Sequence, residues 1–213
     1  MIVDERLVTY INSLDTGNTE ILDEIEKEAI ETYVPIIRKE MQSFLKLILS
    51  IKKPLRILEV GTAVGFSAIL MAEYNPSDCQ IVTIENYEKR IPIARENFKR
   101  AGKEKQITLL EGDAAEVLKE IDEPFDFIFM DAAKGQYIHF MPDVMRLLKK
   151  DGILISDNVL QDGDIIESRF VVTRRNRTIH KRMRDYLYEL THHEELVTSV
   201  LPVGDGITVS VKK

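Results

Sequence analysis

After residue 54 the sequence alternates short apolar runs with longer amphipathic stretches. The apolar runs have the length of β-strands and comprise residues 56–60, 80–84, 106–110, 125–130 and 152–156. The amphipathic stretches between them show helical spacing and comprise residues 64–74, 88–101, 114–121 and 137–149. Alternation of this kind predicts an α/β fold with a mostly parallel sheet and helices on both of its faces.

The N-terminal part of the chain has a different pattern. Apolar residues recur at helical spacing over residues 1–53, which predicts extra helices before the sheet, and Pro35 suits the first turn of the third helix. The sequence contains no repeats, low-complexity tracts or proline-rich linkers. We therefore expect a single domain over residues 1–213, with a helical appendage at 1–53 and an α/β core at 54–213.

The C-terminal part predicts the edge of the sheet. A basic stretch at residues 176–190 has helical character, and two alternating runs follow at residues 195–201 and 207–211. The segment PVGDG joins these two runs, which is typical of an antiparallel hairpin. Together with the earlier runs, the hairpin predicts a seven-stranded sheet.

The composition narrows the class of protein. The formal net charge of −7 argues against unspecific adhesion to nucleic acid, although it does not exclude a local basic patch. A single cysteine, Cys79, excludes an internal disulfide and a cysteine-based zinc site. The apolar runs are too short to span a membrane, and the acidic start of the chain lacks the pattern of a signal peptide. We therefore expect a cytoplasmic protein with no membrane partner.

Ligands of open α/β sheets bind beyond the carboxyl ends of the strands, and the first strand ends in a glycine-containing loop. Gly61 and Gly65 would let the backbone approach a ligand, and Ser67 starts a helix whose N-terminus favours polar or negative groups. Glu85, after the second strand, could accept hydrogen bonds from ribose hydroxyls. Glu59 could bind a cationic amino group but would oppose a pyrophosphate. The loop therefore favours a cofactor that carries an amino acid and a ribose over a nicotinamide dinucleotide.

Two later strand ends add oxygen ligands. Asp131 follows the fourth strand, and Asp157 and Asn158 follow the fifth. Two carboxylates and an amide, without cysteine or histidine beside them, suit magnesium or calcium better than zinc. Single residues of this kind often serve as caps or turn residues, but three at adjacent strand ends favour a metal site. Lys134 lies on the same loop and could act as a base or orient an ionised substrate oxygen.

These motifs together resemble the cation-dependent O-methyltransferases related to the catechol and caffeoyl-coenzyme A enzymes. The resemblance runs from about residue 35 to the C-terminus and rests on the segments LEVGTAVGFS, IEN, FIFMDAAKGQY, LISDNV and LPVGDGITV. It implies a Rossmann-like class I methyltransferase fold and S-adenosylmethionine as the cofactor. The cofactor contacts that it implies are Ile36, Glu59, Ser67, Glu85, Asp113, Ala114 and Asp131, with Asp113 and Ala114 beside the adenine.

The resemblance also implies a mechanism. It implies Asp131, Asp157 and Asn158 as ligands of magnesium or a similar divalent ion, and Lys134 as the catalytic lysine beside Asp131. A metal that chelates two neighbouring substrate oxygens promotes ionisation of the hydroxyl and fixes its direction. We therefore expect a substrate with a hydroxyl next to a second oxygen. Both catechols and 5-hydroxyuridine meet this requirement.

Two features bear on the substrate. Ala132 and Ala133 stand where the catechol enzymes carry a histidine and a tryptophan, which suggests a more open site and argues against a catechol. Beyond the metal pair, basic residues cluster at Arg174, Arg175, Arg177, Lys181, Arg182 and Arg184. Arginine binds phosphate through paired donors, so this cluster predicts an RNA contact at the mouth of the site. The alternative is an ordinary solvated helix face.

The basic segment also resembles the bacterial branch that methylates 5-hydroxyuridine at the tRNA wobble position to 5-methoxyuridine. This resemblance implies the tRNA anticodon loop as partner, where a base can be splayed out without breaking a duplex. The main alternative is a catechol or phenylpropanoid O-methyltransferase that acts on small molecules. A non-enzymatic nucleotide-binding module fits less well, because it would need neither the lysine nor the metal ligands. The apolar N-terminal helices and the family resemblance both favour a homodimer.

Overall fold

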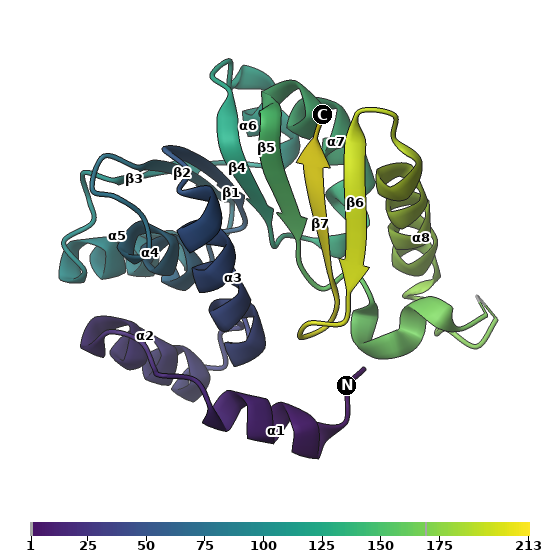
Figure 1. Ribbon diagram of the computed structural model, residues 1–213, viewed down its shortest axis with the longest axis horizontal. Coiled ribbons are helices and arrows are strands. Elements are labelled where there is room, and N and C mark those ends of the chain that lie inside the picture. Colours follow the sequence, from purple (N-terminus) through teal and green to yellow (C-terminus); the bar gives the residue numbers. More distant parts are fainter. Residues whose placement is uncertain (1, 169) are drawn as a thin grey trace.

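A computed structural model describes residues 2–168 and 170–213 and contains one seven-stranded sheet (Figure 1). The strands are β1 Arg56–Val60, β2 Gln80–Glu85, β3 Ile107–Glu111, β4 Phe125–Met130, β5 Leu148–Ser156, β6 Leu196–Leu201 and β7 Ile207–Lys212. Their order in the sheet is β3-β2-β1-β4-β5-β7-β6. The first five strands are parallel, whereas β7 pairs antiparallel with β5 and β6. The predicted sheet and its C-terminal hairpin are confirmed.

Helices cover both faces of the sheet (Figure 1). They are α1 Glu5–Ser13, α2 Glu20–Glu31, α3 Lys39–Lys52, α4 Phe66–Glu73, α5 Ile91–Arg100, α6 Ala114–Glu120, α7 Tyr137–Leu147 and α8 Arg177–His192, with 3₁₀ turns η1 Lys134–Gln136 and η2 Gln161–Ile166. Helices α2 to α5 contribute to the apolar cluster on one face, and α6 to α8 contribute to the cluster on the other. The α/β architecture with helices on both faces is therefore as predicted.

The central strands are apolar at nearly every position because both of their faces are buried. Ile57 and Phe127 belong to the cluster under α2 to α5, whereas their neighbours Leu58 and Ile128 belong to the cluster under α6 to α8. All four side chains are fully buried. Alternate side chains of a strand point to opposite faces, so a strand covered on both sides reads as a continuous apolar run.

The prediction that Pro35 begins the third helix is wrong. Helix α3 begins at Lys39, and its N-cap residue Arg38 has an extended backbone with φ −66° and ψ 159°. The residue before a proline is disfavoured in the helical region, and Tyr33 adopts a left-handed φ of 55° where α2 ends. The segment 33–38 is therefore a non-helical connection, and it leads over the carboxyl ends of the strands.

The N-terminal helices differ in how they meet the core. Helices α2 and α3 bury Leu22, Ile25, Leu45 and Leu49 in the same apolar cluster as the sheet. Helix α1 buries none of its residues and lies at the margin of the molecule (Figure 1). The single-domain organisation stays a prediction. Within residues 2–168 and 170–213, no helix combines the length and apolar character that crossing a bilayer requires.

Candidate active site

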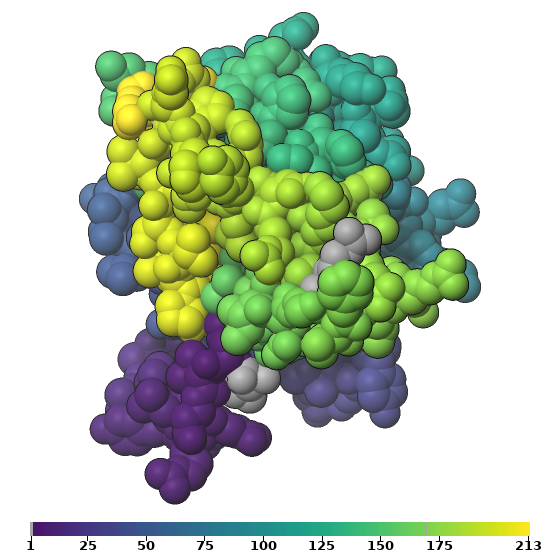
Figure 2. Space-filling model, turned by 90° about the vertical axis from the view of Figure 1, so that its right-hand side faces the viewer, coloured from purple at the N-terminus to yellow at the C-terminus, as the bar shows by residue number. Residues whose placement is uncertain are grey.

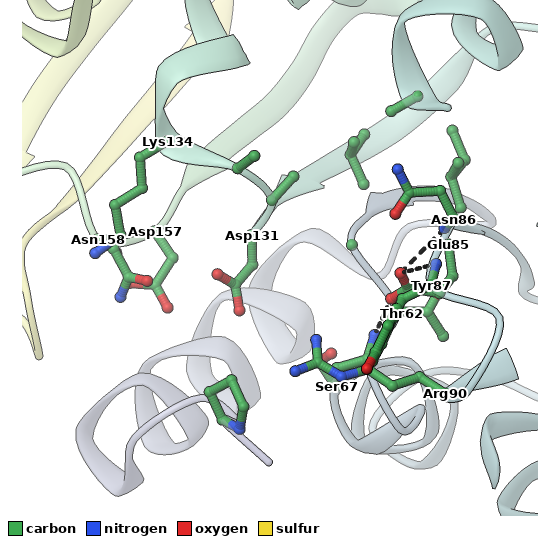
Figure 3. Close-up of a pocket in the computed structure, with 18 of the residues that line it drawn as sticks. Thr62, Ser67, Glu85, Asn86, Tyr87, Arg90, Asp131, Lys134, Asp157 and Asn158 are labelled. Carbon is green, nitrogen blue, oxygen red and sulfur yellow. Dashed lines mark hydrogen bonds between the residues drawn. The ribbon is translucent and has the colours of Figure 1, made fainter. Parts of the chain in front are cut away.

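A cavity of about 960 Å³ lies at the carboxyl ends of β1, β2, β4 and β5. The segment 35–38 walls it on the other side. The predicted site residues that line it are Ile36, Gly61, Ser67, Glu85, Asp113, Ala114, Asp131, Lys134, Asp157 and Asn158. Figure 3 shows two halves, with Ser67 and Glu85 in one and Lys134, Asp157 and Asn158 in the other, while Asp131 lies between them. The fold thus joins the two predicted sets of residues in one cavity.

Glu85 is held in place by backbone amides. Its Oε2 accepts a hydrogen bond from the Ala63 N–H at 2.8 Å, and its Oε1 accepts from the Asn86 and Tyr87 N–H groups at 3.0 and 2.9 Å (Figure 3). Three fixed donors orient the carboxylate, and Oε2, which accepts only one of them, keeps lone-pair capacity for another donor. The geometry therefore suits a group that accepts hydrogen bonds from a cofactor's hydroxyls.

Glu59 lies behind the cavity wall rather than on it. The side chain is fully buried and does not line the cavity. Its Oε2 accepts a hydrogen bond from the Thr83 hydroxyl at 2.5 Å, and Thr83 pairs with the hydroxyl of Thr62, a lining residue, at 2.5 Å. Burial raises the pKa of Glu59 to about 8, and the Ser67 and Thr83 hydroxyls oppose this rise. In this geometry Glu59 reaches the cavity through hydroxyl groups, not by the direct contact that the sequence suggested.

The two predicted loop glycines serve the protein's own packing. Gly61 has a φ of 105°, and a Cβ there would collide with the backbone carbonyl of Asp131. Gly65 is the N-cap of α4 with a φ of 86°, and a Cβ there would collide with the Phe98 ring. Gly65 does not line the cavity, although Gly61 does. Glycine at these positions therefore lets β1 approach β4 and lets α4 approach α5, in addition to any ligand contact.

Asp157 is buried and Asp131 is partly buried, and both line the cavity. Burial raises the pKa of Asp131, and the Lys134 ammonium limits the rise. Burial, followed by repulsion from Asp131, raises the pKa of Asp157. The Asp157 Oδ1 accepts a hydrogen bond from the Asn158 N–H at 2.7 Å. The protein therefore does not fully balance the negative charges of these two carboxylates, and a bound cation would do so.

The possible donors of a metal site come from adjacent strand ends. Asn158 follows Asp157 with a left-handed φ of 58°, a conformation that asparagine tolerates. Among the described residues, no group of three or more histidine, cysteine, aspartate or glutamate side chains is arranged to hold a metal. The two carboxylates and the amide oxygen that the sequence suggests as metal ligands all line this cavity, and their role as ligands stays a prediction. Figure 3 shows Lys134 extending toward the same end of the cavity.

Tyr137 is a structural part of the site that the sequence reading missed. Its ring is fully buried, and its hydroxyl accepts a hydrogen bond from the Ala132 N–H at 3.2 Å. The same hydroxyl lies 3.2 Å from the carbonyl oxygens of Met130 and Asp157 and can donate to either. Tyr137 thus connects the ends of β4 and β5, on which the two acids stand. Its place at the start of a predicted helix gave no signal of this role.

Other lining residues were also missed. Asn86, Tyr87 and Arg90 follow Glu85 and line the cofactor half, and the Arg90 guanidinium carbon lies 5.3 Å from the centre of the Tyr87 ring. Their position directly after a strand end was the available signal. Arg38 on the segment 35–38 and Asp205 on the β6–β7 turn also line the cavity. Asp205 belongs to PVGDG, which the sequence marks only as a turn.

Two of the predicted RNA-binding arginines form hydrogen bonds to backbone carbonyls of neighbouring loops. Arg177 donates from Nε to the Val172 carbonyl at 3.2 Å and from Nη2 to the Phe170 carbonyl at 3.4 Å. Arg182 donates from Nη1 to the carbonyl of Gly135 in η1 at 3.1 Å. These guanidinium groups have backbone partners, so a simple solvated patch does not describe them. The Arg182 contact places α8 directly beside the Lys134 turn.

The rest of the basic cluster is exposed. Lys181 pairs with Asp185 on the next turn of α8 at 2.5 Å. Arg174 and Arg175, just before α8, are exposed and form no ion pair with any residue in the described part of the chain. Helix α8 and η2 lie together on one face, beside the C-terminal hairpin (Figure 2). Arg174 and Arg175 are therefore the basic residues of the cluster that are best placed to meet a ligand from solvent.

The chain is similar to known O-methyltransferases in sequence and in structure. A family model described as O-methyltransferase matches residues 12–213. Catechol O-methyltransferase from Niastella koreensis is 34% identical over 128 residues, which is 58% of this chain and 58% of that protein. A caffeoyl-CoA O-methyltransferase candidate from Staphylococcus aureus superposes with a TM-score of 0.90 at 31% identity, over 99% of this chain and 100% of that one. An O-methyltransferase from Bacillus cereus in complex with SAH gives a TM-score of 0.86 at 26% identity, over 98% and 97% of the two chains.

The fold and the cavity define a Rossmann-like methyltransferase. The family model covers nearly the whole chain, and the chain belongs to the O-methyltransferase family. The fold, the cavity and the relatives together support S-adenosylmethionine-dependent methyl transfer to an oxygen.

Proposed function

We propose that this protein transfers a methyl group from S-adenosylmethionine to the 5-hydroxyl of 5-hydroxyuridine at the tRNA wobble position, using magnesium or a similar divalent ion. The product is 5-methoxyuridine. The main observation behind this proposal is that one cavity contains two sets of groups. The oriented Glu85 carboxylate lies in one half, and the side-chain oxygens of Asp131, Asp157 and Asn158 line the other. The exposed Arg174 and Arg175 favour an RNA substrate over a neutral phenol.

The cofactor half fits S-adenosylmethionine by its donors and acceptors. Glu85 would accept hydrogen bonds from the ribose hydroxyls, and Asp113 and Ala114 would border the adenine. Asp113 is itself fixed as the N-cap of α6, since its Oδ1 accepts the Ala115 N–H at 2.8 Å. Ile36 would cover the cofactor from the segment 35–38. Backbone N–H groups hold the Glu85 and Asp113 carboxylates, which suits a preorganised binding site.

The metal half fits a hard divalent cation. Two carboxylates and an amide oxygen are the donors that magnesium prefers, and a cation would offset the cost of burying the two acids, since burial raises the pKa values of both. When bound, magnesium is a Lewis acid that favours ionisation of the substrate hydroxyl. Lys134 would accept the hydroxyl proton if it is a neutral amine, or, as an ammonium, would orient the ionised oxygen toward the methyl group. Ala132 and Ala133 line the cavity and leave room for a flat nucleobase.

Exposed groups near α8 support the RNA substrate. Phe170 is 80% exposed, and Arg174 and Arg175 follow it on the same connection between η2 and α8. Basic side chains that neutralise phosphates, combined with an aromatic ring that can stack on a base, are the usual elements of single-strand binding. The Arg182 bond to Gly135 holds this region against the Lys134 turn. A wobble base could thus enter the cavity while its neighbours contact this surface.

Replacing Arg174 and Arg175 together with alanine should weaken tRNA binding and lower its salt dependence by about one unit of slope per lost phosphate contact. Methylation of free 5-hydroxyuridine should change little, because neither side chain lines the cavity. Salt titrations of tRNA binding and assays on both substrates measure this. The matched control replaces Lys105 and Lys150, which are exposed near the opposite strand ends. Equal losses on tRNA and nucleoside, or no loss on either, would contradict the assignment.

The substrate is tested by methylation of tRNA from a strain that cannot make 5-methoxyuridine. We expect a higher kcat/KM on this tRNA than on any small catechol, with the methyl group recovered on the wobble uridine. The small-molecule alternative is favoured by the names of the Niastella and Staphylococcus relatives. A catechol or phenylpropanoid that is methylated efficiently, with no transfer to tRNA, would establish that alternative.

We also propose that the protein forms a homodimer through α1. This helix exposes apolar side chains that a soluble monomer would leave in water, with Leu7, Tyr10, Ile11 and Leu14 between 47% and 63% exposed. Light scattering should give twice the chain mass of 24.5 kDa, and replacing Leu7 and Ile11 with glutamate should give the monomer. A wild-type protein of one chain mass would contradict the proposal.

A further inference from the structure

Arg38 forms ion pairs across the mouth of the cavity. Its Nη2 lies 2.8 Å from Oδ1 of Asp205 and 3.5 Å from Oδ1 of Asp162. The Asp205 side chain is only 12% exposed, whereas that of Arg38 is 39% exposed. Arg38 and Asp205 both line the cavity. These contacts join three parts of the chain that are far apart in sequence, namely the segment 33–38, the 3₁₀ turn η2 and the β6–β7 turn.

Asp205 is fixed by the fold, so Arg38 has a rigid partner. Backbone hydrogen bonds join the two segments beyond the pairing of β5 and β7. The Val159 N–H donates to the Gly206 carbonyl at 2.8 Å, and the Leu160 N–H donates to the Asp205 backbone carbonyl at 3.0 Å. Gly206 has a φ of 84°, and any Cβ there would collide with the Leu160 side chain. The turn that carries Asp205 is therefore locked against the residues that follow Asn158.

Within residues 2–168 and 170–213, the segment 35–38 forms no comparable backbone hydrogen bond on its cavity side. Its hydrogen bonds run to α3, where the Gln42 N–H donates to the Arg38 carbonyl at 2.9 Å and Gln42 Nε2 donates to the Ile37 carbonyl at 3.0 Å. Neither bond crosses the cavity. Arg38 supplies the contact from this segment to the β6–β7 turn, and its positive charge offsets the repulsion between the Asp162 and Asp205 carboxylates.

We propose that Arg38, through its ion pair with Asp205, is a positioning residue that holds the segment 35–38 closed over the bound cofactor. The pair keeps Ile36 against the cavity, so the cofactor is enclosed between this segment and the ends of β1 and β2. The inference rests on S-adenosylmethionine as the cofactor, but not on tRNA as the substrate or on the metal.

Calorimetry with SAH on the full-length protein tests the role of Arg38. Arg38→Met should lower SAH affinity by about tenfold, the effect of losing one charge-assisted contact. The KM for S-adenosylmethionine should rise similarly while kcat at saturation changes little. Arg38→Lys should fall between Arg38→Met and the wild type, since lysine keeps the charge but not the two-sided reach. Asp205→Asn should cost less than Arg38→Met, because it removes repulsion between Asp162 and Asp205 together with the ion pair.

The control is Arg100→Met. Arg100 ties α2 to α5 through an ion pair with Glu28 at 2.8 Å and is 29% exposed, but it does not line the cavity. SAH affinity should be unchanged in this variant. Adding Asp205→Asn to Arg38→Met should cause no further loss, since both changes break the same contact. Unchanged affinity in Arg38→Met, or additive losses in the double variant, would overturn the inference alone. Failure of the wild type to bind SAH would overturn the cofactor assignment as well.

Discussion

Replacing Asp157 with alanine is expected to lower kcat/KM by more than roughly a thousandfold, because it removes a ligand of the proposed catalytic metal. Chelator treatment of the wild type should have the same effect. The affinity for SAH should stay within about threefold of the wild-type value, since Glu85 lies in the other half of the cavity. Kinetics with and without magnesium, together with SAH calorimetry, measure these effects. Full activity in chelator would exclude the metal mechanism.

Replacing Asp157 with asparagine should stabilise the metal-free protein at alkaline pH. Burial raises the pKa values of Asp131 and Asp157 in the folded state, and repulsion from Asp131 adds to the rise at Asp157, so each acid favours folding when it is protonated. A group with a raised folded-state pKa stabilises below its unfolded-state value near 4 and loses this contribution as the pH rises through the folded value. The Tm in chelator should therefore rise as the pH falls from about 8 to about 5.

Asp157→Asn should reduce this pH dependence and raise the Tm in chelator at alkaline pH. The amide oxygen can still accept the Asn158 N–H, while the repulsion with Asp131 is lost. Magnesium should raise the Tm of the wild type and have little effect on the variant. A variant with the same pH profile as the wild type would show that ionisation of Asp157 does not cause the pH dependence.

Replacing Glu85 with alanine is expected to reduce SAH affinity by about ten- to a hundredfold, which corresponds to roughly 1.5–3 kcal/mol for a charge-assisted contact. The loss has two sources. The ribose hydroxyls lose their acceptor, and the N–H groups of Ala63, Asn86 and Tyr87 lose the carboxylate that pairs with them. Calorimetry measures the affinity, and a melting curve separates it from loss of fold.

Glu111→Ala is the matched control for this change. Glu111 is the register partner of Glu85 on the neighbouring strand β3, but it pairs with Arg95 and does not line the cavity. Its replacement should leave SAH affinity unchanged. If Glu85→Ala binds SAH as tightly as the wild type does, Glu85 does not hold the ribose.

The sequence predicted those parts of the molecule that depend on local pattern. The sheet follows from apolar runs that are continuous because β1 and β4 are buried on both faces. The residues of both halves of the cavity were found because parallel strands bring their carboxyl ends to one edge. Glu85 and Asp157 stand directly after such ends and line the cavity, as expected.

The sequence did not predict contacts between distant segments. Arg38 and Asp205 are separated by most of the chain, and neither position has a pattern that indicates its partner. Glu59 was placed correctly at a strand end, but the direction of its side chain depends on strand pleating and on Thr83. The sequence suggested Arg177 as an RNA contact, because the folded loop is needed to show that this side chain binds the Val172 and Phe170 carbonyls.

A crystal structure of the protein with SAH and manganese tests the two-part cavity most directly. Manganese accepts the same oxygen donors as magnesium and is located by its anomalous scattering. We expect one manganese peak bounded by the Asp131 and Asp157 carboxylates and the Asn158 amide oxygen, with the SAH ribose hydroxyls on Glu85. Manganese bound elsewhere, or a ribose that does not contact Glu85, would contradict the account.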